Sequence, residues 1–180
     1  MADRTLAAPR PLTADLGRIF LLGSVLGWLG EVALHVFTTG HIVNRGVLHG
    51  PWMPLYGAGC VVFVLMGRMW LLPPRLPAIF TMGVLAAGIL EYSCGALLEG
   101  LFHMRWWDYG YKYLAINRRI WFPALMGFSA LGTYLALNER RMRNLLAPHW
   151  GYHIAALMMV CDLAVSLMEP NTGMHISSGL

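Results

Sequence analysis

Charged residues are scarce in this chain. Only 12% of its 180 residues are Asp, Glu, Lys or Arg, whereas 57% are hydrophobic. A soluble domain carries about 25% charged residues, so this composition argues against an ordinary soluble protein and predicts a membrane protein of one domain. The net charge of +4 is more typical of membrane topology signals and contact with lipid headgroups than of nucleic-acid binding. We therefore expect membrane lipids, and no nucleic acid, among the partners.

Several chemical signatures are also missing. The chain has no Gly-rich phosphate loop, no zinc-finger spacing and no serine in a nucleophile elbow. Its three cysteines all lie in apolar segments and form no C-x-x-C pair, which is typical of small core residues. We expect no metal site and no cofactor, and the sequence identifies no catalytic residue.

Five apolar segments approach the length of about 20 residues that a membrane helix needs. They are Leu16–Phe37, Met53–Leu72, Ala78–Phe102, Ile120–Asn138 and Gly151–Met168. These segments predict an all-α, polytopic transmembrane helical bundle that forms a single domain over residues 16–168. Residues 1–15 would be an N-terminal cytoplasmic segment, and residues 169–180 a polar, frayed tail. Whether the fifth segment spans fully stays open, because it is short and Asp162 interrupts it.

The distribution of Lys and Arg predicts the orientation. Eight of these residues lie on the side of the N-terminus and five on the other side, namely Arg45, Arg105, Lys112, Arg118 and Arg119. The positive-inside rule then puts the N-terminus in the cytoplasm, and we expect a bacterial inner (plasma) membrane. The loops at 38–52 and 103–119 follow the first and third spans, so they share a side in either orientation.

Three carboxylates interrupt the apolar spans: Glu31 in the first span, and Glu91 and Glu99 in the third. An ionised side chain at membrane depth costs about 2.5–3.5 kcal/mol, which indicates a role in structure, binding or chemistry. Each acid shares a helix face with small residues, which are Gly23 and Gly27 in the first span and Gly88 and Gly95 in the third. Because small residues let helices approach closely, packing of the two faces would bring the three acids together.

The first loop combines glycine, proline and arginine. Gly46 and Gly50 permit tight turns, while Pro51 stiffens the chain. Arg45 can bind a carboxylate or phosphate with two hydrogen bonds, or it can simply pair with Glu31 in a surface turn.

The second loop is rich in aromatic residues, which are typical of the membrane interface. It also contains Asp108, which would pair with Arg45 or Arg105 or accept a proton.

From these features we predict a polar intramembrane pocket built by the three glutamates beneath both loops. Its candidate residues are Glu31, Asn44, Arg45, Gly46, Gly50, Pro51, Tyr56, Glu91, Tyr92, Gly95, Glu99, Arg105, Trp107, Asp108 and Tyr109. A network of ion pairs that only fixes the helix register remains the alternative interpretation of the same residues.

Four blocks of sequence carry a family resemblance: Leu26–Glu31, Asn44–Gly57, Leu90–Glu99 and Arg105–Tyr109. In these blocks the chain resembles the CmpB family of type IV ABC-transporter membrane proteins, to which the eukaryotic TMEM229 proteins are related. It departs from the family pattern at Arg118, where glycine is usual. The resemblance implies transport, and because the chain has no Walker motif, the ATPase would be a separate subunit.

Three functions follow as hypotheses. The first is a permease or membrane binding component of the ABC-transporter type, which would form a homo-oligomer or bind the ATPase. The second is a membrane-embedded enzyme that acts on a lipid or isoprenoid, with paired carboxylates as general acid and base. The third is a structural or assembly factor.

Overall fold

The computed structural model describes residues 12–69, 75–138 and 151–172. Within them the helices are α1 (Leu12–Thr39), α2 (Pro54–Met69), α3 (Arg75–Phe102), α4 (Phe122–Leu137) and α6 (Gly151–Met168). A two-stranded antiparallel hairpin, β1 (Ala115–Ile116) and β2 (Ile120–Trp121), precedes α4. The predicted all-α fold is confirmed, with this small hairpin as an addition to it.

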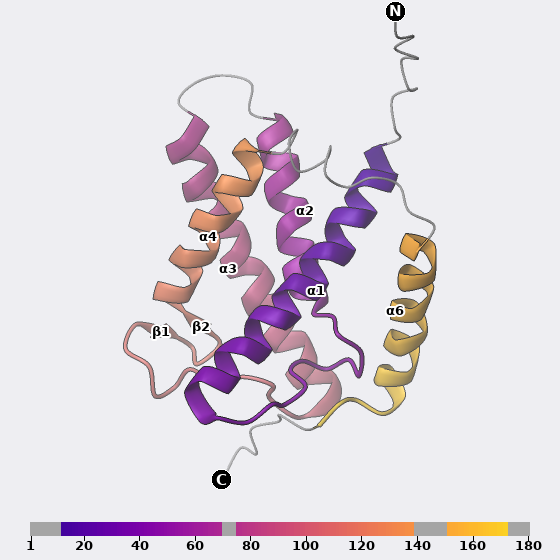
Figure 1. The fold of residues 1–180 in the computed structure, drawn as a ribbon. Helices are drawn as coiled ribbons and strands as arrows, with labels where there is room; N and C mark the ends of the chain where they lie inside the picture. The colour runs from indigo at the N-terminus through magenta and orange to yellow at the C-terminus, as the bar shows by residue number, and fades with distance from the viewer. Residues whose placement is uncertain (1–11, 70–74, 139–150, 173–180) are drawn as a thin grey trace, which may run out of the picture.

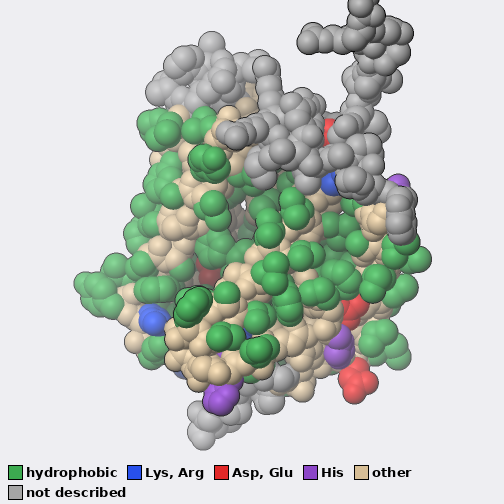
Figure 2. Space-filling view, in the orientation of Figure 1, with side chains coloured by type: hydrophobic (Ala, Val, Ile, Leu, Met, Phe, Trp, Pro, Cys, Tyr) green, Lys and Arg blue, Asp and Glu red, His purple; other side chains and the backbone are tan. Residues whose placement is uncertain are grey.

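The helices differ in how much of a membrane they can cross. Three apolar helical segments are long enough to span: Asp15–Thr39, Leu76–Phe102 and Gly151–Met168. Helices α2 and α4 have 16 residues each, which corresponds to about 24 Å against a hydrocarbon core of about 30 Å. The five expected apolar segments are therefore all helical, and α4, which ends at Leu137 with its C-cap at Asn138, is short. Figure 2 shows mostly hydrophobic side chains on the viewed face, as expected for a surface in contact with lipid.

The first loop determines where α2 begins. It leaves the end of α1 and returns along that helix, so that the Met53 amide donates a 2.9 Å hydrogen bond to the Ser24 carbonyl. Between Ser24 and the helix end at Thr39, α1 rises by about 22 Å. The loop is therefore re-entrant, and α2 begins deep in the bundle (Figure 1).

The second loop repeats this arrangement. It follows α3 and folds back until the Ile120 side chain and Leu125 of α4 lie against Gly88, about 21 Å along the helix from Phe102. The chain therefore forms two helix–loop–helix units, α1 with α2 and α3 with α4, and in each the loop folds back along the first helix. Both units run in the same direction, and both loops lie at the lower end in Figure 1.

Phe63 of α2 holds the bundle together where three helices meet. Its ring lies against Gly83 of α3 and Gly132 of α4, at positions where any larger side chain would collide with it. Phe63 is buried with Ile79 and Ala136. The glycines thus create the space that one aromatic ring fills, and this contact joins the first unit to the second.

The small-residue faces of α1 and α3 do not pack on each other as expected. Gly23 lies against Cys60 and Gly27 against Tyr56, so the face on α1 packs on α2. The face on α3 meets the second loop and α4 instead. The prediction that these two faces meet is therefore wrong.

Candidate functional site

Asn44 and Gly46 shape the first loop. The Asn44 side-chain oxygen accepts a 2.6 Å hydrogen bond from Trp28 Nε1, and its Nδ2 donates a 2.7 Å bond to the His49 carbonyl. Gly46 has φ +93°, a backbone conformation that residues with a side chain rarely adopt. Both residues thus set the path that brings Arg45 to the bundle.

Glu31 is bonded within the first unit. Its Oε2 accepts a hydrogen bond from Arg45 Nη2 at 3.3 Å, and its Oε1 accepts one from the Tyr56 hydroxyl. All three side chains are partly buried. The pairing of Arg45 with Glu31 agrees with one of the two predictions made for this arginine.

Glu91 comes from the second unit and lies within electrostatic range of Glu31 and Tyr56. It is half-buried on α3. Among the described residues, no side chain or backbone group donates a hydrogen bond to its carboxylate. Glu91 thus brings a carboxylate without a cationic partner to the group formed by Glu31, Arg45 and Tyr56.

Tyr109 of the second loop lies within electrostatic range of Glu91, Glu31 and Arg45. Burial raises the pKa of its hydroxyl above the ordinary value, and the negative charges of Glu91 and Glu31 raise the pKa further. The phenol therefore stays protonated at physiological pH and available as a hydrogen-bond donor. We call Glu31, Arg45, Tyr56, Glu91 and Tyr109 the Glu31–Glu91 cluster.

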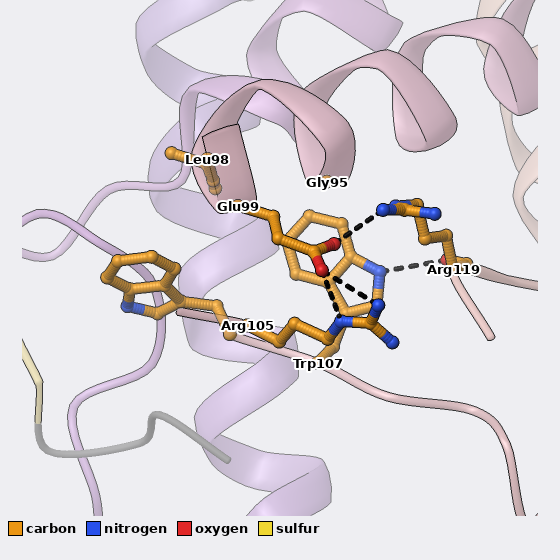
Figure 3. A pocket seen from close by; sticks show the side chains of 7 residues that line it. Gly95, Leu98, Glu99, Arg105, Trp107 and Arg119 are labelled. Atoms are coloured by element: carbon orange, nitrogen blue, oxygen red, sulfur yellow. Dashed lines mark hydrogen bonds and ion pairs between the residues drawn. The ribbon is translucent and has the colours of Figure 1, made fainter. Parts of the chain in front are cut away.

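Glu99 belongs to a separate group of ion pairs (Figure 3). Its Oε1 accepts hydrogen bonds from Arg105 Nε at 2.9 Å and Nη2 at 2.8 Å, and its Oε2 accepts one from Arg119. Trp107 Nε1 donates to the Arg119 carbonyl at 2.9 Å, beside Gly95. The cavity among these residues is about 10 Å³, which is room for one water molecule. Glu99 therefore has two arginine partners of its own, different from the residues that bond to Glu31.

Asp108 pairs mainly with Arg118 and not with Arg45. The Arg118 Nε donates to both carboxylate oxygens, at 3.1 and 3.0 Å, and the Gly110 amide donates at 2.7 Å. Hydrogen bonds from the Arg118 guanidinium hold the pKa of the Asp108 carboxyl below its ordinary value, and the Gly110 amide adds to this effect. Arg105 is 3.7 Å away, so the expected pairing with that residue is the weaker of the two.

The remaining candidates lie outside the Glu31–Glu91 cluster. The Tyr92 hydroxyl accepts a 2.9 Å hydrogen bond from Asn117, and Arg119 lies 5.3 Å from the centre of its ring. Pro51 is exposed, and the Gly50 amide donates to Asp162 of α6 at 2.8 Å.

The comparison with family models covers most of the chain. Residues 18–169 match the model described as "Putative ABC-transporter type IV", the CmpB family. The chain belongs to this family. No curated protein and no solved structure matches it. The family and the long apolar helices make it an integral membrane protein of the ABC-transporter type.

Asp162 fastens the first loop to α6 in this member of the CmpB family. Its carboxylate accepts hydrogen bonds from the Gly50 amide, from the His49 amide at 3.1 Å and from Trp52 Nε1 at 2.6 Å. Ser166, one turn further along α6, bonds to both Asp162 and His49. Asp162 and Ser166 lie four residues apart on one face of an apolar segment, and this spacing favours hydrogen bonding toward the rest of the protein, as the structure shows.

The tail after α6 joins both loops. The Asn171 amide donates to the Val47 carbonyl at 2.8 Å, and the Asn171 carbonyl accepts a 2.9 Å hydrogen bond from Trp106 Nε1. As far as Thr172, the tail is therefore held in place and not frayed as expected. The rest of the tail, like residues 1–11, lies outside the described residues.

Arg118 adopts a backbone conformation that favours glycine, the residue that the family resemblance led us to expect here. Its φ is +60°, a conformation that costs a residue with a Cβ about 1–2 kcal/mol but costs glycine little. We expect R118G to melt about 2–4 °C higher than R118A, because both lose the Asp108 pair but only alanine keeps the strain. Thermal unfolding in detergent measures the difference, and equal melting temperatures would contradict the strain argument.

Proposed function

We propose that this chain is the membrane-embedded component of a transport system and that the Glu31–Glu91 cluster is its substrate or ion site. One observation carries the proposal: groups from both helix–loop–helix units converge inside the bundle. Glu31, Arg45 and Tyr56 come from the first unit, while Glu91 and Tyr109 come from the second. Transporters built from repeated units bind their substrates and coupling ions at the interface between the units.

The charges of the cluster favour a cationic ligand. The charge of Arg45 offsets that of Glu31, whereas Glu91 has no cationic partner among the described residues. A carboxylate inside a membrane protein without such a partner is a typical site for a proton, a metal cation or an ammonium group. Figure 2 shows a hollow between α4 and α1 with an acidic side chain visible inside it, which supports access from outside the bundle.

The other predicted properties complete the proposal. A separate ATPase subunit would bind on the cytoplasmic side, and the chain would form a homo-oligomer or a complex with that subunit. With the N-terminus in the cytoplasm of a bacterial inner membrane, both loops and the nearer end of the cluster face outward. Glu99 fits the structural interpretation better, because its two arginines leave no free carboxylate oxygen.

The matched variants E91Q and E99Q test this proposal. We expect one or more of NaCl, KCl and ammonium chloride to raise the melting temperature of the wild type above its value in N-methylglucamine chloride at equal ionic strength. E91Q should keep the wild-type melting temperature in N-methylglucamine chloride but lose this increase. E99Q should keep the increase but unfold more easily, by about 1–2 kcal/mol, because Arg105 and Arg119 lose their acceptor.

Two outcomes would contradict the proposal. The first is that no cation raises the melting temperature of the wild type. The second is that E91Q destabilises the protein while its response to cations stays unchanged, which would make Glu91 a structural residue. Native mass spectrometry of the same samples would show whether E91Q also loses a small molecule that the wild type retains.

A further inference from the structure

Two pairs of aromatic rings belong to the Glu31–Glu91 cluster or contact it. The Tyr56 ring pairs with the Phe128 ring of α4, at 5.0 Å between the ring centres. The Tyr109 ring pairs with the Trp121 ring of β2, at 6.4 Å. The Tyr56 and Tyr109 hydroxyls lie within electrostatic range of each other and of Glu91. The cluster thus combines a carboxylate with aromatic rings from both helix–loop–helix units.

Phe128 is the ring of this group that reaches the protein surface, with 39% of the residue exposed. Its partner Tyr56 also lies against Gly27 of α1. The two rings are therefore placed between α1 and α4, where Figure 2 shows the hollow with an acidic side chain inside it. A ligand that enters this hollow from outside the bundle would have both aromatic rings and a carboxylate within reach.

The cluster leaves few oxygen atoms for a metal ion. Both oxygens of Glu31 accept hydrogen bonds, one from Arg45 and one from the Tyr56 hydroxyl. Among the described residues, the Glu91 carboxylate and the Tyr109 hydroxyl are the side-chain oxygens of the cluster that remain. Metal cations give up their water for a shell of about six or more oxygens. An alkylated ammonium group needs less, because one carboxylate offsets its charge and aromatic faces attract its methyl groups.

We infer that the ligand of the Glu31–Glu91 cluster is a small organic cation with an alkylated ammonium group. The inference rests on the proposed function and narrows its ligand from cations in general to one class. Glu91 supplies the negative charge that Arg45 does not offset, which matches a monovalent cation. Tyr56, Phe128 and Tyr109 supply the rings, since an ammonium group within about 6 Å of a ring centre is attracted by the face of the ring.

Two phenylalanines of α4 form a matched pair for testing the rings. Phe128 contacts Tyr56, whereas Phe122, at the start of the helix, lies beside Ile120 and Leu125 instead. Both phenylalanines are 39% exposed. F128L removes the ring at the cluster but keeps an apolar side chain, and F122L makes the same change elsewhere on the helix. F128Y keeps an aromatic ring and should restore what F128L loses.

Thermal unfolding in tetramethylammonium chloride, NaCl and KCl at equal ionic strength would measure the preference. We expect the wild type, F122L and F128Y to melt about 3 °C higher in tetramethylammonium chloride than in either other salt. E91Q and F128L should lose most of this difference, because the first lacks the charge and the second lacks the ring. Each variant is compared with itself in three salts, so a change in its overall stability does not affect the result.

Two results would overturn the inference. If NaCl or KCl stabilises the wild type through Glu91 and tetramethylammonium does no better, the proposed function stands but its ligand is an inorganic cation. If F128L responds to tetramethylammonium as strongly as F122L does, the cation does not lie on the Phe128 ring. By contrast, the proposed function itself fails, and this inference with it, if none of these cations raises the melting temperature.

Discussion

The D162A variant is expected to unfold about 3–5 kcal/mol more easily than the wild type. Asp162 is 11% exposed and accepts hydrogen bonds from the His49 and Gly50 amides and from Trp52 Nε1. A hydrogen bond to a charged group contributes about 1.5–3 kcal/mol, and its loss leaves these donors without a partner inside the protein. We expect the melting temperature to fall by about 10 °C and the first loop to separate from α6.

Hydrogen exchange would locate the damage. In D162A the His49 and Gly50 amides should exchange much faster, while the amides of α2 and α3 stay protected. The control is E169A, which removes an exposed carboxylate near the end of the same helix and should leave both the melting temperature and the exchange unchanged. If D162A and E169A behave alike, Asp162 does not fasten the loop.

The F63A variant is expected to cost about 3–5 kcal/mol, the range measured when a buried aromatic ring is removed. Phe63 is 4% exposed, and the glycines that face it on α3 and α4 have no side chains to fill the space. The cavity would lie where α2, α3 and α4 meet, so the contact between the two helix–loop–helix units should weaken most.

Unfolding in increasing concentrations of SDS would measure this loss. F37A removes the same side chain from a position that is 89% exposed at the end of α1 and should unfold like the wild type. A small effect of F63A, comparable to that of F37A, would mean that the neighbouring helices close around the cavity.

Composition and apolar length were enough to predict the helices, because a membrane leaves few options for a backbone that must satisfy its own hydrogen bonds. They also placed both loops on one side. The depth of the loops was not predictable in the same way. The Met53 amide donates a hydrogen bond to the Ser24 carbonyl. A hydrogen bond between backbone groups depends on the path of the loop and not on the side chain at either position.

The site was predictable only in part, for reasons that specific residues illustrate. A glycine in a helix indicates that another part of the protein packs closely there, but it does not identify that part. Gly27 therefore gave no indication that Tyr56 would lie against it. Glu91 and Glu99 share a helix face, yet they lie about 12 Å apart along the axis. At that separation they meet different partners: Glu91 approaches the other unit, while Glu99 meets the arginines of the second loop.

The re-entrant loops also have a consequence for how this protein enters the membrane. Because both loops fold back along the long helix before them, α2 and α4 begin beside the middle of that helix and not at its end. Each packs closely on the long helix that precedes it. We therefore expect insertion as two preformed hairpins, α1 with α2 and then α3 with α4, with the cluster assembled only when the second hairpin docks on the first.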